Sequence, residues 1–307
     1  MTEVGVGEGA GSPRERETPG EWATFWVYRS MEVLGKALPT KLGRRVFMAL
    51  GSAGYHALPK VRATVAANQA RVLGRPVDDP QVRANTKEAF RLYGRHRFDT
   101  FDLIDWTEEQ VRHAFTWEHL EAFQDPLAAG TGVIGVLPHF GNWDAAGRAA
   151  AAVGMRPFAV AERLRPDRLY RLFQQNRIAM QMDVVPLDDP RVGSTLAKAL
   201  ADNRLVALVA DRELKGGGIE VEMFGASRKM PTGPAMLSIT SGAPIVVAKV
   251  RQTPDGWTCT LIPVPEVPRT GDRRADVRAL TQAIAHEFEL VISSYPPEWH
   301  LFQPGWE

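Results

Sequence analysis

Apolar and polar residues follow two different periods along this chain of 307 residues. From Glu21 to about Glu121 apolar side chains recur at helical spacing, as in Trp22, Phe25 and Trp26, and this pattern predicts a series of helices. After Thr131, short apolar runs bounded by glycine and proline alternate with helical segments. Such alternation is typical of an α/β fold in which helices flank a central, mostly parallel sheet.

The individual elements follow from these periods and from the residues that bound them. In the N-terminal region one helix ends near Pro39, a second begins at Thr40, and two more are predicted at Val61–Leu73 and Asp79–Asp102. We predict strands at Gly132–Leu137, Phe158–Val160, Val184–Pro186, Leu205–Ala210, Ile219–Met223, Ile245–Val250 and Thr258–Ile262. The helices between and after them are predicted at Trp143–Val153, Asp167–Met180, Thr195–Asp202, Pro234–Ser241 and Ala275–Ser293.

Three segments are expected: a disordered tail at 1–20, a helical region at 21–121 and an α/β core at 122–307. The helical region is expected to pack on the core and to form one domain with it. Its first two helices combine Trp and Phe with Lys and Arg, a mixture that suits a membrane interface. The same apolar face could instead pack on the core, and both interpretations stay open.

Composition excludes several classes of protein. The net charge of +1 gives no overall field that would recruit nucleic acid. Cys259 is the lone cysteine, so the chain has no disulfide framework and no cysteine-based zinc site, and a reducing, cytoplasmic setting fits. No apolar run approaches the ~20 residues that cross a bilayer. The histidines other than His139 show no metal-binding spacing, so we expect no metal.

Chemistry is most strongly indicated where the first strand of the core ends. His139 lies in the turn after that strand, at the carboxyl end where open α/β sheets bind their ligands. Asn142 is a good N-cap for the next helix, and Asp144 falls in its first turn. A carboxylate near the imidazole would fix its tautomer and leave the other ring nitrogen to accept a proton. A capped helix beside a turn histidine would explain the same residues without catalysis.

Charged residues follow two further strands. Glu162, Arg163 and Arg165 come after the strand that begins at Phe158, and Arg177 lies near the end of the next helix. Arginine side chains in such places could bind phosphate, although Glu162 among them could simply be an ion-pair partner.

Asp211, Arg212 and Glu213 follow the strand at Leu205, on the same edge of the sheet as His139. They could orient a base or bind a hydroxyl substrate, or they could form only a salt-bridge set at that edge. The turn at Thr232 and Gly233 begins a helix, and its free amides could bind phosphate or a developing oxyanion. Proline at position 234 would favour that helix start without any function.

Other enzyme classes are disfavoured. The chain has no G-x-S-x-G turn, no Walker A sequence and no G-x-G-x-x-G between a strand and a helix. Since no nucleophile is evident, His139 is expected to act as a base on a hydroxyl group that the substrate supplies.

These residues resemble those of the lysophospholipid acyltransferase superfamily. The chain is similar in particular to the branch that holds the lipid A acyltransferases and the actinobacterial phosphatidylinositol mannoside acyltransferases, from about Trp22 to Trp306. The matching segments, in order, are His139–Asp144, Ala161–Pro166, Ala210–Glu213, Met223–Gly225, Met230–Ala235 and Tyr295–Trp306. The last segment resembles the mannoside enzymes more than the lipid A enzymes.

The resemblance implies transfer of a fatty acyl chain from acyl-CoA to a sugar hydroxyl of a membrane glycolipid. It makes His139 the general base, oriented by Asp144. It places a further acid at Asp211, although the order of Asp211 and Glu213 looks swapped relative to the mannoside enzymes, so either could be that acid. Glu162 matches a family acid close to the histidine.

The resemblance also implies the binding groups and the setting. Arg163, Arg165, Arg177 and Arg212 would bind coenzyme A or inositol phosphates. Amides near Phe140, Gly141 and Asn142, or at Thr232 and Gly233, would hold the oxyanion. No cofactor is needed beyond acyl-CoA as donor, and the enzyme would lie on the cytoplasmic face of the cell membrane as a peripheral protein. A lipid A-type or lysophospholipid acyltransferase, an acyl-CoA hydrolase and a non-catalytic lipid-binding protein stay open as alternatives.

Overall fold

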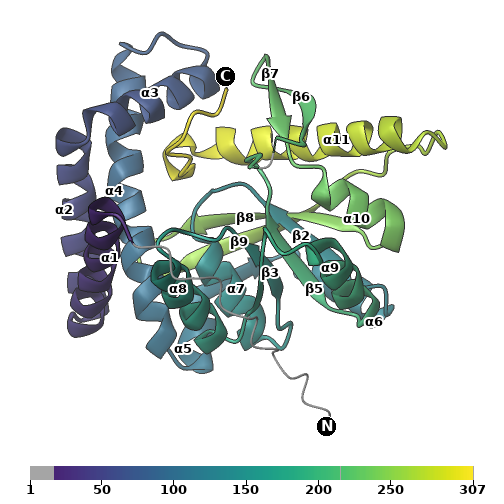
Figure 1. The fold of residues 1–307 in the computed structure, drawn as a ribbon, viewed down its shortest axis with the longest axis horizontal. Coiled ribbons are helices and arrows are strands. Elements are labelled where there is room, and N and C mark those ends of the chain that lie inside the picture. The colour runs from purple at the N-terminus through teal and green to yellow at the C-terminus, as the bar shows by residue number, and fades with distance from the viewer. Residues whose placement is uncertain (1–16, 215, 307) are drawn as a thin grey trace.

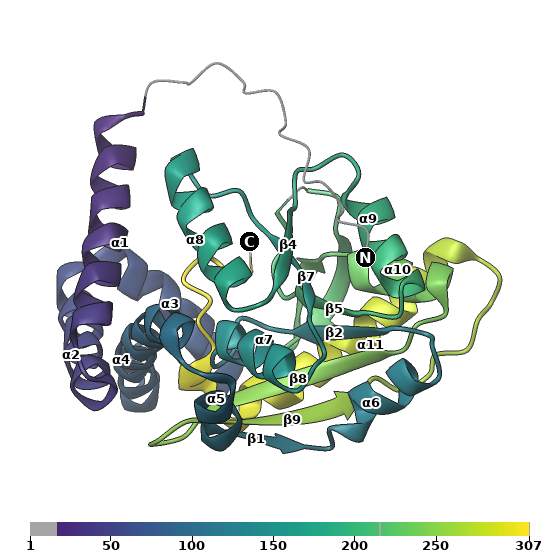
Figure 2. The same ribbon diagram turned by 90° about the horizontal axis from the view of Figure 1, so that it is seen from below.

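A seven-stranded sheet forms the centre of the computed structural model, which describes residues 17–214 and 216–306. Its strand order is β1-β9-β8-β2-β5-β3-β4 (Figures 1 and 2), and every pairing is parallel except that of β8 with β9. The strands are β1 (Phe115–Glu118), β2 (Val133–Leu137), β3 (Phe158–Ala161), β4 (Asp183–Pro186), β5 (Leu205–Val209), β8 (Ile245–Gln252) and β9 (Trp257–Pro263). The predicted α/β class and its mostly parallel sheet are confirmed.

Helices cover the faces of this sheet, and the helices of the N-terminal region form a group beside it (Figure 1). The N-terminal region comprises α1 (Pro19–Ala37), α2 (Thr40–Ala57), α3 (Pro59–Leu73), α4 (Pro80–Asp102), the short η1 (Leu103–Asp105) and α5 (Glu108–Ala114). The core adds α6 (Glu121–Ala128), α7 (Trp143–Ala152), α8 (Asp167–Ala179), α9 (Val192–Ala201), α10 (Gly233–Ser241), α11 (Arg273–Ser294) and η2 (Pro296–Glu298). Most of the predicted tail, residues 1–16, lies outside the described residues, and α1 already begins at Pro19.

Two strands depart from the sequence prediction. β1 lies in the segment predicted to be helical, and β7 (Ala226–Met230) forms a separate antiparallel hairpin with β6 (Ile219–Met223). β1 is a four-residue edge strand that pairs with β9, far along the chain, so its own hydrophobic pattern is too short to predict a strand. β7 pairs with β6 across a turn at Phe224 and Gly225, and both of these residues adopt a positive φ.

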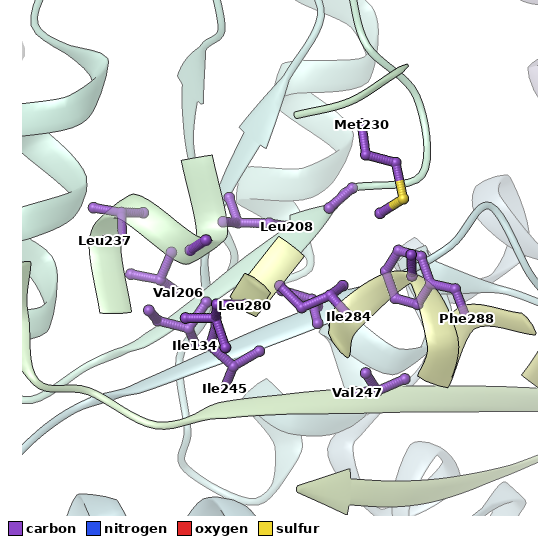
Figure 3. Packing of buried hydrophobic residues seen from close by; sticks show 14 of the residues in the cluster. Ile134, Val206, Leu208, Met230, Leu237, Ile245, Val247, Leu280, Ile284 and Phe288 are labelled. Carbon is purple, nitrogen blue, oxygen red and sulfur yellow. The ribbon is translucent and has the colours of Figure 1, made fainter. Parts of the chain in front are cut away.

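The sheet buries a hydrophobic layer on each face. On one face Ile134, Val206 and Val247 pack against Ile284 and Phe288 of α11, together with α9 and α10 (Figure 3). The opposite face packs against α5, α6 and α7. Apolar burial on this scale, at about 25 cal/mol per Å², is the main stabilising term for the sheet.

The helical region stands beside the sheet, with α4 between the outer helices and the core (Figures 1 and 2). α2 and α4 cross closely because each contributes a glycine: a Cβ on Gly94 would lie 2.1 Å from the carbonyl oxygen of Phe47 and 3.3 Å from Cα of Gly51. Within residues 17–214 and 216–306, no helix combines the length and the apolar character that crossing a bilayer requires. Association of this region with a membrane thus stays a prediction.

Replacing Gly94 by alanine tests this crossing. The new methyl group cannot fit against the backbone of α2, so we expect Gly94→Ala to lower the free energy of unfolding by roughly 2 kcal/mol. At Gly54 of α2 a Cβ would meet only side-chain atoms of Phe90 at 3.6 Å or more, so Gly54→Ala should leave that free energy unchanged or raise it. Chemical denaturation of both variants measures the difference, and equal effects would contradict the close crossing.

Candidate active site

His139 occupies the turn that leaves the carboxyl end of β2. The turn is tight, since the amide of Phe140 donates to the carbonyl oxygen of Pro138 at 2.6 Å. It runs against β8: Gly141 has a φ of 63°, and a Cβ there would stand 1.6 Å from the carbonyl oxygen of Val250. Only glycine fits this position. Asn142 then caps α7 by accepting the amide hydrogen of Ala145 at 2.9 Å, as its type predicted.

The parallel register of β2 and β5 brings an acid to His139. Leu137 is paired with Val209, so His139 and Asp211 each lie two residues beyond a matched pair of strand residues. Asp211 Oδ1 lies 2.6 Å from Nδ1 of His139, and Asp211 Oδ2 accepts the backbone amide hydrogen of His139 at 3.0 Å. The expected convergence at this edge is confirmed for these two residues.

The carboxylate of Asp211 is fully buried and charged. Burial alone would raise its pKa, but His139, the indole N–H of Trp299 at 2.8 Å and the guanidinium of Arg228 together lower the pKa to about 2. Arg228 also donates to the backbone carbonyl of Asp211. An ionised carboxylate next to Nδ1 requires a hydrogen on that nitrogen, which leaves Nε2 of His139 as the proton acceptor.

The structure corrects the expected partner of His139. Asp144 does not hold the imidazole; its Oδ1 accepts from Nε of Arg177 at 3.1 Å, and its Oδ2 from the hydroxyl of Thr100 at 3.3 Å. The first turn of α7 directs this carboxylate toward α4 and α8, away from β5. The acid that holds the ring is therefore Asp211, which also answers which of the two acids after β5 contacts His139.

The C-terminal segment, which follows α11, also contacts His139 and Asp211. Trp299 forms an isolated bridge with Phe140, and the amide of His300 donates to the carbonyl oxygen of His139 at 2.6 Å. Asn68 of α3 holds this segment by donating to the carbonyl oxygens of Leu301 and Gln303 at 3.0 and 2.9 Å. Sequence reasoning missed the role of Trp299, because its contact with Asp211 spans 88 residues.

Two other histidines near the site are buried and neutral. Burial lowers the pKa of His96 well below its ordinary value, and it lowers the pKa of His300 to about 3. His96 and His139 both lie beside Trp143, with ring centroids 4.1 and 5.2 Å away. Of these three imidazoles, His139 alone carries a carboxylate partner and is 25% exposed, so it is the candidate base.

A cavity of about 870 Å³ opens beside His139. Its polar part is lined by Tyr28, Tyr93, Arg97, Asp144 and Arg177. Arg97 donates to the hydroxyl of Tyr93 at 2.5 Å. Neither Tyr93 nor Arg97 was singled out from the sequence, where both look like part of an amphipathic helix.

The apolar part of the cavity exists because the sheet carries small side chains on the face covered by α7. Each of five adjacent strands contributes one of them, and all five line the cavity: Gly135, Ala159, Ala207, Ala248 and Cys259. Gly147 and Ala150 of α7 close it from above. These small side chains leave an apolar space between the sheet and α7 as part of the same cavity as His139.

The remaining predicted residues are placed around this cavity or at the surface. Arg212 and Glu162 form an ion pair at 3.4 Å at the cavity lining, and Glu213 lines it as well. Arg163 pairs with Asp188 at 3.0 Å at the surface, and Arg165 is exposed.

The expected oxyanion amides are only partly in place. The amide of Phe140 is bound to Pro138, and that of Gly141 donates to the carbonyl oxygen of Glu298 at 2.9 Å, so neither is free for a substrate. Thr232 and Gly233 do line the cavity, at the first turn of α10. Among the described residues, no cluster of three or more His, Cys, Asp or Glu side chains is placed to hold a metal ion.

The chain is similar to known proteins over most of its length. Residues 11–307 match the family model described as bacterial lipid A biosynthesis acyltransferase. The chain is 34% identical over 279 residues to the phosphatidylinositol mannoside acyltransferase of Mycolicibacterium smegmatis, covering 89% of this chain and 88% of that protein. It is 33% identical over 294 residues to the enzyme of the same name from Mycobacterium tuberculosis, covering 92% and 89%. The resemblance inferred from the motifs is confirmed, and the chain belongs to the bacterial lipid A biosynthesis acyltransferase family.

Proposed function

We propose that this protein transfers a fatty acyl chain from acyl-CoA to a sugar hydroxyl of a phosphatidylinositol mannoside. The observation that carries the proposal is the His139–Asp211 pair, whose imidazole lines a cavity with both polar and apolar lining residues. The names of the two mycobacterial relatives support this acceptor over lipid A. A protein that only binds lipid has no use for an imidazole held by a buried carboxylate, so we favour an enzyme.

The reaction needs one base and no covalent intermediate. As the acceptor hydroxyl oxygen attacks the thioester carbonyl carbon, Nε2 of His139 takes the hydroxyl proton. The C–S bond then breaks, and the leaving thiolate receives that proton from the imidazolium. Asp211 keeps Nδ1 protonated throughout and stabilises the charge that the ring carries between the two steps.

The binding groups are assigned from the cavity lining. The amides of Thr232 and Gly233 are the proposed donors to the developing oxyanion. Arg97 and Arg177, which line the cavity, are proposed to bind the acceptor's phosphate, with Tyr93 and Asp144 holding their side chains. Arg212, which also lines the cavity, and the exposed Arg163 and Arg165, which follow β3, are proposed to contact coenzyme A.

We further propose that α1 and α2 bind the cytoplasmic face of the cell membrane. Trp22 and Trp26 of α1 lie one turn apart with their rings tilted by 58° and ring centroids 6.0 Å apart, and both are exposed. Leu34 of α1 and Leu42 of α2 are exposed as well, and α1 stands at the edge of the molecule (Figure 2). Aromatic and basic side chains together on an exposed helix suit the headgroup region of a bilayer.

Two substitutions test the catalytic pair. We expect His139→Ala to abolish transfer while the protein still folds, with the free energy of unfolding lowered by roughly 1–3 kcal/mol because the buried Asp211 loses a hydrogen-bond partner. Asp211→Asn should lower kcat about 10³-fold with little change in KM, because an amide there no longer enforces the reactive tautomer. Steady-state kinetics with purified variants measure both. Wild-type turnover in Asp211→Asn, with the loss confined to Asp144→Asn, would reassign the positioning acid.

Filling the apolar space should change the preferred chain length. Ala207→Leu places a branched side chain across the path from His139, so transfer from palmitoyl-CoA should fall about tenfold while transfer from octanoyl-CoA is retained. Ala201→Leu, the same change at an exposed position of α9, should leave both rates unchanged. An equal loss with both donors would place the acyl chain elsewhere.

The membrane surface can be tested without turnover. Replacing Trp22 and Trp26 together by serine should weaken binding to anionic vesicles about tenfold, since two interfacial aromatic side chains are lost. A matched variant replaces Val77 and Leu290, which are equally exposed apolar residues elsewhere. Co-sedimentation measures the bound fraction, and a drop of equal size in the matched variant would contradict this assignment.

A further inference from the structure

A second cavity shares no lining residue with the cavity beside His139. It has a volume of about 510 Å³ and is bounded by α2, α4 and the turn between β8 and β9. Six basic side chains line it, against three acidic ones. The basic residues are Lys41, Arg44, Arg45, Arg91, Arg95 and Arg251.

Two of the three acids beside these cations, Glu88 and Glu298, are already engaged. Nε and Nη2 of Arg91 donate hydrogen bonds to the two carboxylate oxygens of Glu88. Arg251 lies 3.4 Å from Glu298, whose carboxylate also accepts the backbone amide hydrogen of Gln252. The wall therefore keeps an excess of positive charge, with Lys41 and Arg45 exposed at its rim.

The wall itself is rigidly built. Arg44 and Arg95 both pair with the buried Asp99, at 2.8 and 3.3 Å. Arg95 also donates to the carbonyl oxygens of Thr253 and Gly256, at 2.6 and 3.1 Å, and so fixes the turn between β8 and β9. These guanidinium groups are held in place before any ligand arrives.

Two buried polar groups in this wall are left without a partner. Gln252 is 91% buried, and among the described residues neither its amide nitrogen nor its amide oxygen has a hydrogen-bond partner. Nη2 of Arg44 is buried and unpartnered in the same sense. Leaving such donors unsatisfied costs roughly 1–3 kcal/mol each, a cost that a bound acceptor would remove.

We propose that this cavity binds a phosphate-bearing ligand, either an anionic lipid headgroup or a free phosphorylated compound. The arginine fork and the amide N–H groups match phosphate oxygens, and the volume leaves room for a small organic group beside the phosphate. The proposal concerns a site separate from the catalytic one, and it does not rest on acyl transfer.

Binding of two probes by isothermal titration calorimetry tests it, on the full chain at constant ionic strength and without acyl donor. Inorganic phosphate represents the free ligand, and monomeric dihexanoylphosphatidic acid represents the lipid headgroup. Binding of phosphate supports a free phosphorylated ligand, whereas binding of the phosphatidic acid alone supports a headgroup. Binding of neither probe would overturn the proposal.

Variants assign the binding to this cavity. Replacing Lys41 and Arg45 by alanine should weaken binding about tenfold, while replacing Lys60 and Arg83, which are exposed and outside the cavity, should not. Gln252→Leu should weaken binding too, yet keep or raise the free energy of unfolding in chloride buffer, because it removes a buried amide that has no partner. Unchanged affinity in both cavity variants would overturn the proposal even if a probe binds.

Discussion

The arrangement around the active site depends on one buried charge, the carboxylate of Asp211. It accepts hydrogen bonds from the ring and the backbone of His139 and from the indole of Trp299, and these bonds join β2, β5 and the C-terminal segment. Burying a carboxylate is costly unless its oxygens are satisfied, so each of these donors is needed to keep the group ionised. The same bonds fix the tautomer of His139, and in this way the requirement for stability and the requirement for a base coincide.

The C-terminal segment connects distant parts of the chain. Glu298 lies in the wall of the basic cavity and accepts the amide hydrogen of Gly141 through its carbonyl oxygen. The next residue, Trp299, contacts Asp211, and α3 holds the segment through Asn68. The helical region thus does more than cover the core, because it supports the segment that contacts the His139–Asp211 pair.

Much of the fold follows from local sequence. Gly132–Leu137 reads as a buried strand because glycine and proline bound a short apolar run, and Asn142 marks a helix start by its side-chain chemistry. β1 and β7 escape prediction because each is stabilised mainly by a partner strand. In the site, too, some features follow from local sequence and others depend on residues far apart in the chain. The placement of His139 and Asp211 at one edge follows from strand order, whereas the choice of Asp211 over Asp144 depends on the register between β2 and β5. Spacing along the chain favours Asp144, and spacing across the sheet favours Asp211.

The central claim is that this pair catalyses acyl transfer to a glycolipid hydroxyl. The most direct measurement follows label from radiolabelled palmitoyl-CoA in the presence of mannosylated phosphatidylinositol, a lipid A precursor or a lysophospholipid, with free fatty acid quantified alongside. We expect label on the mannosylated lipid and little free fatty acid. Label on no acceptor, or release of free fatty acid at the same rate with and without acceptor, would contradict it.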